Sequence, residues 1–121
     1  MLKILVADDH EVVRQSLVKF LVEEFSPVEI QEAADADSLI ALESGGGWDV
    51  IISDLAMPGG GGMEALRVIR SKDSTVPFIV ISTYPPEQYE SRVLKAGAQA
   101  YISKDELPNA LIRAVKTLLP R

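Results

Sequence analysis

Apolar and polar positions follow two alternating patterns along this chain. Short, nearly continuous apolar runs are separated by longer stretches in which apolar residues recur every three or four positions. The first pattern is typical of strands buried on both faces, and the second of amphipathic helices. The pattern predicts five strands, at Lys3–Ala7, Val28–Ala33, Asp49–Ser53, Pro77–Ser82 and Ala98–Ser103.

A helix is predicted after each strand from its apolar stripe. The stripes are Val13, Leu17, Phe20 and Leu21; Leu39, Ile40 and Leu42; Met63, Leu66 and Ile69; Tyr89, Val93 and Ala96; and Leu107, Leu111, Ala114, Val115 and Leu118. Asp35 or Asp37 is expected to cap the second helix, and Asp105 the fifth. Pro85 and Pro86 are expected at the start of the fourth, where a missing N–H costs nothing.

This alternation predicts an α/β fold, with a parallel sheet covered by helices on both faces. The first, third and fourth strands are the most apolar, so we expect them at the centre of the sheet. The second strand, Val28–Ala33, alternates between polar and apolar residues, which favours an edge position. A length of 121 residues suits one domain, spanning 1–121.

Composition removes several classes of function. The chain is 47% hydrophobic and 25% charged, with no cysteine and one histidine, His10. Disulfides, thiolate metal sites and multi-histidine sites are therefore excluded. A net charge of −6, with scattered Lys and Arg, argues against direct nucleic-acid binding by this domain. No apolar run approaches the ~18 residues of a membrane helix, and no signal sequence is visible, so we expect a cytoplasmic protein without membrane contact.

Polar residues stand where the predicted strands end. Asp8 and Asp9 follow the first strand and Asp54 the third, while Ser82 ends the fourth and Lys104 follows the fifth. Because ligands of open α/β sheets bind at the carboxyl ends of the strands, these side chains are expected to converge. Crowded carboxylates need a cation, and oxygen ligands suit Mg²⁺. The glycine runs lack the Gly-Lys-Ser/Thr ending of a nucleotide-binding loop, which favours transfer of a phosphoryl group to a carboxylate.

These motifs resemble the receiver domain of two-component response regulators. The similarity rests on Asp8-Asp9, on Asp54-Leu-Ala-Met-Pro with Gly62 downstream, on Ser82 and on Lys104, and it covers the whole chain in order. It implies a flavodoxin-like, doubly wound (βα)5 fold with strand order 2-1-3-4-5, the order that receiver domains share with flavodoxin. The segments 8–14 and 103–105 further resemble the LuxR-type subgroup of transcription factors.

The resemblance implies a metal site with four contributors. Asp9 and Asp54 would ligate Mg²⁺ directly, Asp8 would act through water, and the backbone carbonyl of Ala56 would complete the protein ligands.

It also assigns roles toward phosphate. Asp54 would accept the phosphoryl group, Ser82 would hydrogen-bond one of its oxygens, and Lys104 would pair with another. Tyr101 would be the aromatic side chain that turns inward when Ser82 moves. We expect self-catalysed phosphorylation and dephosphorylation of Asp54 rather than a conventional enzyme activity.

The same resemblance implies partners. A histidine kinase or phosphotransfer protein would supply the phosphoryl group, and the altered surface would bind a partner or a second copy in a homodimer to control output, expected to be transcription. DNA would be contacted only through a C-terminal helix-turn-helix domain, which this chain does not contain.

Two alternatives stay open at this point. A degenerate receiver would act as a phosphorylation-independent binding module, but its mark, the loss of an acidic or Lys position, is absent. A phosphatase of the haloacid dehalogenase type would carry a second Asp two residues after the nucleophile, where Ala56 stands. His10 is interpreted as a loop or cap residue, and Arg14 either pairs with an acidic neighbour or contacts a partner.

Overall fold

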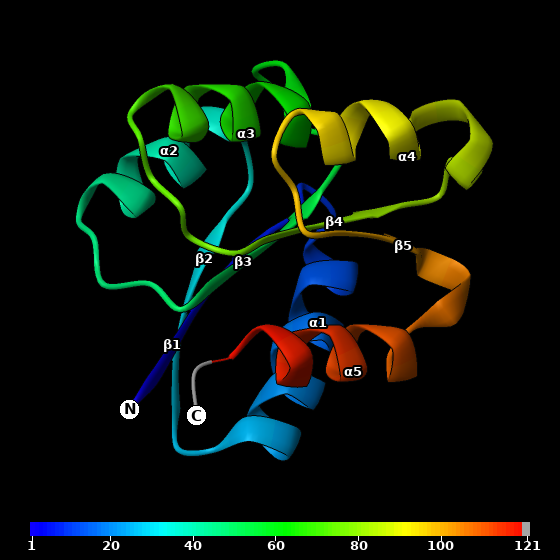
Figure 1. Ribbon diagram of the computed structural model, residues 1–121. Helices are drawn as coiled ribbons and strands as arrows, with labels where there is room; N and C mark the ends of the chain where they lie inside the picture. The colour runs from blue at the N-terminus through cyan, green and yellow to red at the C-terminus, as the bar shows by residue number, and fades with distance from the viewer. Residues whose placement is uncertain (120–121) are drawn as a thin grey trace.

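Five parallel strands form the centre of the molecule in the computed structural model, which describes residues 1–119 (Figure 1). The strands are β1 (Leu2–Ala7), β2 (Val28–Ala33), β3 (Val50–Asp54), β4 (Phe78–Ser82) and β5 (Ala100–Ser103). Their order is β2-β1-β3-β4-β5, as the resemblance implied, and the predicted edge strand β2 lies at an edge. The last two positions of the predicted domain, 120 and 121, lie outside the described residues.

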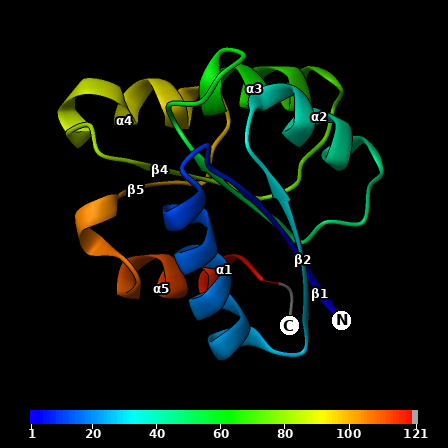
Figure 2. The ribbon, with the colours of Figure 1, turned by 180° about the vertical axis from the view of Figure 1, so that it is seen from behind.

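Helices cover both faces of the sheet, as the alternation predicted. They are α1 (Glu11–Phe25), α2 (Ala36–Ser44), α3 (Gly61–Ser71), α4 (Pro86–Lys95) and α5 (Asn109–Leu118), with a short 3₁₀ helix, η1 (Lys104–Glu106), before α5. Helices α2, α3 and α4 lie on one side of the sheet and α1 and α5 on the other, which the two opposite views show (Figures 1 and 2). The molecule is therefore a three-layer α/β sandwich.

Alternate residues of each central strand pack into opposite layers. Leu5, Ile51 and Val80 join the core beneath α2, α3 and α4, whereas Ile4 and Ile52 join the core shared with α1 and α5. All of these side chains are fully buried. Burial on both faces is the physical reason why these strands read as continuous apolar runs.

Two of the expected helix starts are confirmed. The Asp35 side chain accepts a 2.7 Å hydrogen bond from the Ser38 amide and caps α2. Pro85 stands at the N-cap of α4, and Pro86 is its first residue. Asp35 supplies an acceptor for a free amide of the first turn, and Pro86 supplies a fixed φ at a position where no N–H is needed.

The expected start of the fifth helix is wrong. Asp105 lies inside η1, Leu107 follows that turn, and Pro108 occupies the N-cap of α5. Ser103 caps η1 instead, because its hydroxyl accepts from the Asp105 amide at 3.2 Å while Glu106 reaches back to the Ser103 amide. This reciprocal capping box ends β5 in a tight turn and displaces α5 along the chain.

The loop after β3 packs closely against the start of α3. A methyl group on Gly62 would lie 2.4 Å from the carbonyl oxygen of Asp54, and one on Gly61 would lie 2.2 Å from that of Leu55. Gly61 also has a φ of +72°. Two of the four glycines at 59–62 are thus required by close backbone approach, and they hold α3 against the end of β3.

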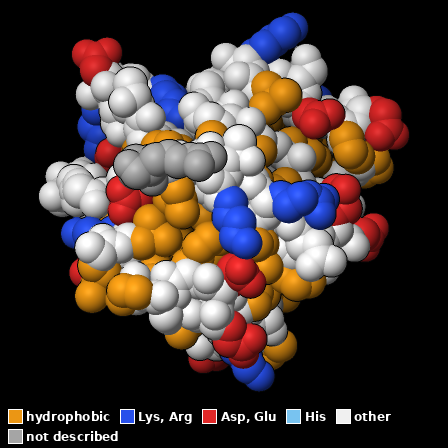
Figure 3. Space-filling model, turned by 60° about the horizontal axis from the view of Figure 1, so that its bottom comes forward, with side chains coloured by type: hydrophobic (Ala, Val, Ile, Leu, Met, Phe, Trp, Pro, Cys, Tyr) orange, Lys and Arg blue, Asp and Glu red, His pale blue; other side chains and the backbone are white. Residues whose placement is uncertain are grey.

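The opposite end of the sheet holds the only tryptophan of the chain. Trp48 donates from Nε1 to the Leu42 carbonyl at 2.9 Å, and the ammonium of Lys3 stands 4.7 Å from its ring centre. Figure 3 shows the lower side of the molecule, where apolar side chains gather near the middle and charged side chains of both signs surround them. Within residues 1–119, none of the helices combines the length and the apolar character needed to span a bilayer.

Candidate functional site

The ends of β1 and β3 bring four possible ligand groups together. Asp8, Asp9, His10 and Asp54 each offer one ligand atom, and these atoms all lie within 4.8 Å of one another. Strand β1 pairs directly with β3, so the turn after Ala7 stands beside Asp54. Asp8 and Asp54 are buried, whereas the Asp9 side chain is 33% exposed, so the cluster opens toward solvent on the side of Asp9.

Lys104 closes the inner side of this cluster. Its Nζ lies 3.0 Å from Oδ2 of Asp54 and 3.3 Å from Oδ2 of Asp8, and its side chain is 16% exposed. Burial alone would lower the pKa of Lys104, but its hydrogen bond to Asp54 and the charges of Asp54 and Asp8 together raise that pKa above its ordinary value. Lys104 is therefore a fixed positive charge between two carboxylates at neutral pH.

The environment of Asp54 shifts the pKa of its carboxyl. Burial raises the pKa of its carboxyl above the ordinary value, and the negative charge of Asp8 adds to that rise, while Lys104 and the Ala56 amide partly oppose it. The Ala56 N–H donates to Oδ1 of Asp54 at 3.3 Å. A cation bound at the free oxygens would favour the ionised form further, since opposite charge lowers a carboxyl pKa.

The donor set fits a single hard cation. Three carboxylates from two neighbouring strand ends supply oxygen ligands, which Mg²⁺ prefers, and Lys104 leaves the cluster short of full charge balance. The Ala56 carbonyl as a further ligand stays a prediction. Sequence reasoning did not place His10 in this cluster, yet its Nδ1 lies 3.3 Å from carboxylate oxygens of both Asp8 and Asp9.

Ser82 and Tyr101 meet at the backbone of one residue, Tyr84. The Tyr84 amide donates to Ser82 Oγ at 2.9 Å, and the Tyr101 hydroxyl donates to the Tyr84 carbonyl at 2.8 Å. Ser82 is buried at the end of β4, whose neighbour β3 ends in Asp54. Tyr101 is also buried, so its ring already lies inward in this structure.

Arg14 is paired with an acidic neighbour, one of the two possibilities that the sequence left open. Its guanidinium contacts the Glu32 carboxylate on β2 and the backbone carbonyl of Asp8. Glu32 itself was missed, because a polar residue on an edge strand carries no distinguishing sequence signal.

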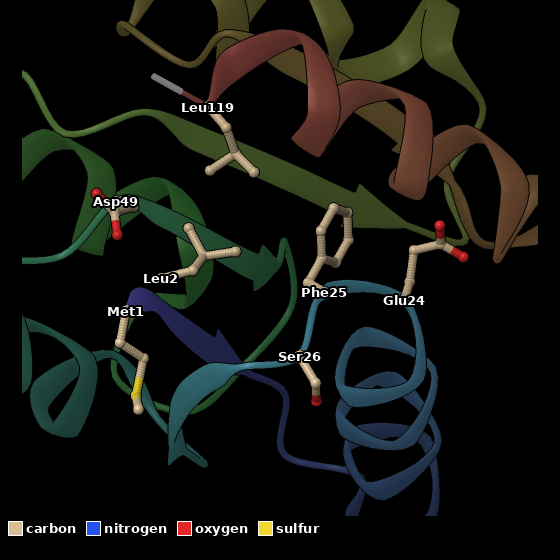
Figure 4. Close-up of a pocket in the computed structure, with 7 residues that line it drawn as sticks. All are labelled: Met1, Leu2, Glu24, Phe25, Ser26, Asp49 and Leu119. Atoms are coloured by element: carbon tan, nitrogen blue, oxygen red, sulfur yellow. The ribbon is translucent and has the colours of Figure 1, made fainter. Parts of the chain in front are cut away.

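A separate hollow of about 530 Å³ lies at the other end of the sheet (Figure 4). It is lined by Met1, Leu2, Glu24, Phe25, Ser26, Asp49 and Leu119. Its carboxylates are already engaged: Glu24 pairs with Lys116 at 3.1 Å, and Asp49 accepts from the Lys3 amide at 2.8 Å. The chemistry of the molecule is therefore concentrated at the acidic cluster.

Comparison with known proteins agrees with this geometry. The sequence profile of the response regulator receiver domain matches residues 4–116. Response regulator UvrY of Escherichia coli is 29% identical over 118 residues, covering 98% of this chain and 54% of that protein. The chain thus spans about half the length of the curated relatives it matches.

Solved structures agree as well. A LuxR-family two-component response regulator from Aurantimonas has a TM-score of 0.86 and 30% identity, covering 95% of this chain and 82% of that one. The response regulator TrrA of Thermotoga maritima, solved in complex with Mg²⁺-BeF, has a TM-score of 0.87 and 31% identity, covering 98% and 100%. The LuxR-type relatives match the subgroup that the sequence motifs indicate. The chain belongs to the receiver domain family of two-component response regulators.

Proposed function

We propose that this receiver is a phosphorylation switch in which Asp54 accepts a phosphoryl group from a histidine kinase or phosphotransfer protein. The observation that carries the proposal is the position of Asp54, buried at the end of β3 with Lys104 3.0 Å from Oδ2 and the acidic cluster beside it. An aspartate held between a fixed cation and a cation site can attack phosphorus while the added charge is neutralised.

The transfer is a displacement at phosphorus. An Asp54 oxygen forms the new O–P bond, and the donor leaves with the electron pair of the bond that breaks. Lys104 pairs with one oxygen of the transferred group. In the unphosphorylated chain the Ser82 hydroxyl accepts a hydrogen bond from the Tyr84 amide. On phosphorylation it gives up that bond and donates to another oxygen of the transferred group. Attack of water on the same phosphorus returns Asp54 to its free state.

Asp8, Asp9 and Asp54 are the residues that would hold Mg²⁺, with the Ala56 carbonyl as a further ligand. When bound, Mg²⁺ supplies positive charge that stabilises the phosphoryl oxygens during transfer. The TrrA structure, in complex with Mg²⁺-BeF, supports this assignment by similarity.

The output follows from the tie between Ser82 and Tyr101. When Ser82 turns toward phosphate, the backbone of Tyr84 loses one partner, and the hydrogen bond from Tyr101 to Tyr84 holds the loop in its new place. The surface of α4, β5 and α5 then changes its affinity for a partner or for a second copy in a homodimer. The similarity to LuxR-family regulators supports a cytoplasmic role in transcription, with DNA contacted by a separate helix-turn-helix domain.

Mass spectrometry tests the proposal. The chain is incubated with Mg²⁺ and acetyl phosphate, and we expect one adduct of about 80 Da, the mass of a phosphoryl group. Asp54→Asn should carry no adduct. Asp49→Asn, which changes an aspartate at the opposite end of the sheet, is the matched control and should be modified like the wild type.

The other readings give different results. A degenerate receiver would form no adduct with any donor. A phosphatase would consume the donor rapidly without accumulating an adduct. Either outcome would overturn the proposed switch.

A further inference from the structure

One arginine on α1, Arg14, joins the turn that carries the acidic cluster to strand β2. Its Nη1 donates to the backbone carbonyl of Asp8 at 2.8 Å, and its Nε donates to Oε1 of Glu32 at 2.8 Å. The Arg14 side chain is only 16% exposed. Because both bonds come from one planar guanidinium, the orientation of each partner is fixed relative to the other.

These contacts hold Asp8 at both of its peptide groups. The Asp8 amide donates to the Ala33 carbonyl of β2 at 3.0 Å, and the Asp8 carbonyl accepts from Arg14, which is anchored on the preceding residue of β2, Glu32. The Asp8 carbonyl belongs to the peptide that leads into Asp9. The plane of that peptide, and with it the direction in which the Asp9 side chain leaves the backbone, is therefore tied to the end of β2.

Charge alone does not account for this arrangement. The positive charge of Arg14 is matched by Glu32 at 2.8 Å, so the pair adds little net field at the cluster. The pair supplies a second, rigid link from the edge strand to this turn, beside the bond from the Asp8 amide to Ala33 at 3.0 Å and the short-range bond from the His10 amide to the Asp8 carboxylate at 2.9 Å.

We propose that Arg14, anchored by Glu32, is a positioning residue that sets the affinity of the acidic cluster for Mg²⁺. The inference rests on the proposed function, because it assumes that Asp8 and Asp9 help to hold the ion. Arg14 does not contact the ion. It acts by fixing the peptide between two of the ligands, as outer contacts fix ligands in other metal sites.

Isothermal titration of Mg²⁺ into the full chain tests this role. Arg14→Met keeps an unbranched stem but removes both hydrogen bonds, and we expect its dissociation constant for Mg²⁺ to rise about tenfold. Glu32→Leu, on an edge strand where the side chain is 34% exposed, should raise it in the same direction because Arg14 loses its anchor. The matched control is Gln15→Leu, since Gln15 donates to the same oxygen of Glu32 at 2.9 Å and has no bond to Asp8.

A second readout separates positioning from damage to the fold. In Arg14→Met the Mg²⁺ concentration giving half-maximal adduct formation should rise about tenfold, as its affinity does, while the maximal rate at saturating Mg²⁺ stays within about twofold of wild type. Equal dissociation constants in wild type, Arg14→Met and Glu32→Leu would overturn the inference and leave the proposed function intact. No Mg²⁺ binding by the wild-type chain would overturn the metal site itself, and this inference with it.

Discussion

The hydroxyl of Tyr101 donates a 2.8 Å hydrogen bond to the backbone carbonyl of Tyr84. This bond joins β5 to the loop between β4 and α4, and the same residue of the loop donates its amide to Ser82. The loop beside Asp54 is thus held by one bond from its own strand and one from the neighbouring strand.

Removing the Tyr101 hydroxyl should weaken the fold by a small and defined amount. Tyr101→Phe keeps the buried ring but leaves the Tyr84 carbonyl without this donor, so we expect a loss of about 1 kcal/mol in the free energy of unfolding. Urea denaturation measures it. Tyr89→Phe is the control, because within residues 1–119 the Tyr89 hydroxyl has no hydrogen-bond partner of this kind. Equal stabilities of Tyr101→Phe and wild type would show that the bond contributes nothing in solution.

Binding of Mg²⁺ should stabilise the folded chain by mass action. When free Mg²⁺ exceeds its dissociation constant a hundredfold, the expected gain is about 2.7 kcal/mol. Asp9→Ala removes a carboxylate of the cluster and should abolish the gain, whereas Asp49→Asn should retain it. Thermal denaturation at increasing Mg²⁺ concentrations is the measurement. A melting temperature that does not respond to Mg²⁺ in the wild type would contradict the prediction.

The stability of the chain in a chelator should depend on the ionisation of Asp54. Burial raises the pKa of Asp54 in the folded state, so the folded state binds this proton more tightly than the unfolded state does. Protonation of Asp54 should therefore stabilise the folded state. This contribution to the free energy of unfolding is fully present below the ordinary carboxyl pKa of 3.8, and it is lost as the pH rises through the raised pKa of folded Asp54. Lys104, whose pKa is also raised, stays charged throughout this range.

Comparison with Asp54→Asn isolates that contribution. Other carboxyl groups titrate in both proteins, so the difference between their pH profiles in urea denaturation reports on Asp54. We expect the free energy of unfolding of Asp54→Asn to rise relative to that of the wild type as the pH rises. Parallel profiles of the two proteins would contradict this prediction.

A methyl group on Gly62 should be costly for steric reasons alone. In Gly62→Ala the new Cβ would lie 2.4 Å from the Asp54 carbonyl oxygen, so α3 or the end of β3 must move, at a cost of about 1–3 kcal/mol. Gly45→Ala is the matched control, because its nearest contact is at 3.4 Å and its φ is −69°, and its free energy of unfolding should change by less than about 0.5 kcal/mol. Similar losses in the two variants would rule out close approach as the cause.

Much of the fold could be predicted from sequence because its signals are local. Continuous apolar runs identified β1, β3 and β4 as central strands, and the alternation of Val28–Ala33 identified the edge strand. The end of β5 could not be predicted in the same way. The apolar spacing placed Leu107 in the last helix, but the capping box of Ser103 and Glu106 forms a separate turn first. Two side-chain hydrogen bonds outweighed the periodic pattern at that point.

The site divides along a similar line. Asp8, Asp9, Asp54 and Lys104 could be placed together because each stands at the end of a strand, and topology brings strand ends to one edge. Residues that lie within an element, and not at the carboxyl end of a strand, gave no such signal. Arg14 sits in the first turns of α1 and Glu32 within β2, and their pairing across 18 positions depends on how the helix crosses the sheet.

The positions of Trp48 and of two tyrosines make tryptophan and tyrosine fluorescence report on different parts of the molecule. Trp48 lies two residues before β3, with its indole bonded to the Leu42 carbonyl and the Lys3 ammonium over its ring, while Asp54 ends that strand. The rings of Tyr84 and Tyr89 pack in a tilted arrangement with centres 5.1 Å apart, and the backbone of Tyr84 is bonded to Ser82. Tryptophan emission is therefore expected to follow global unfolding with little response to events at Asp54. Tyrosine emission is the intrinsic reporter for the loop that responds to them.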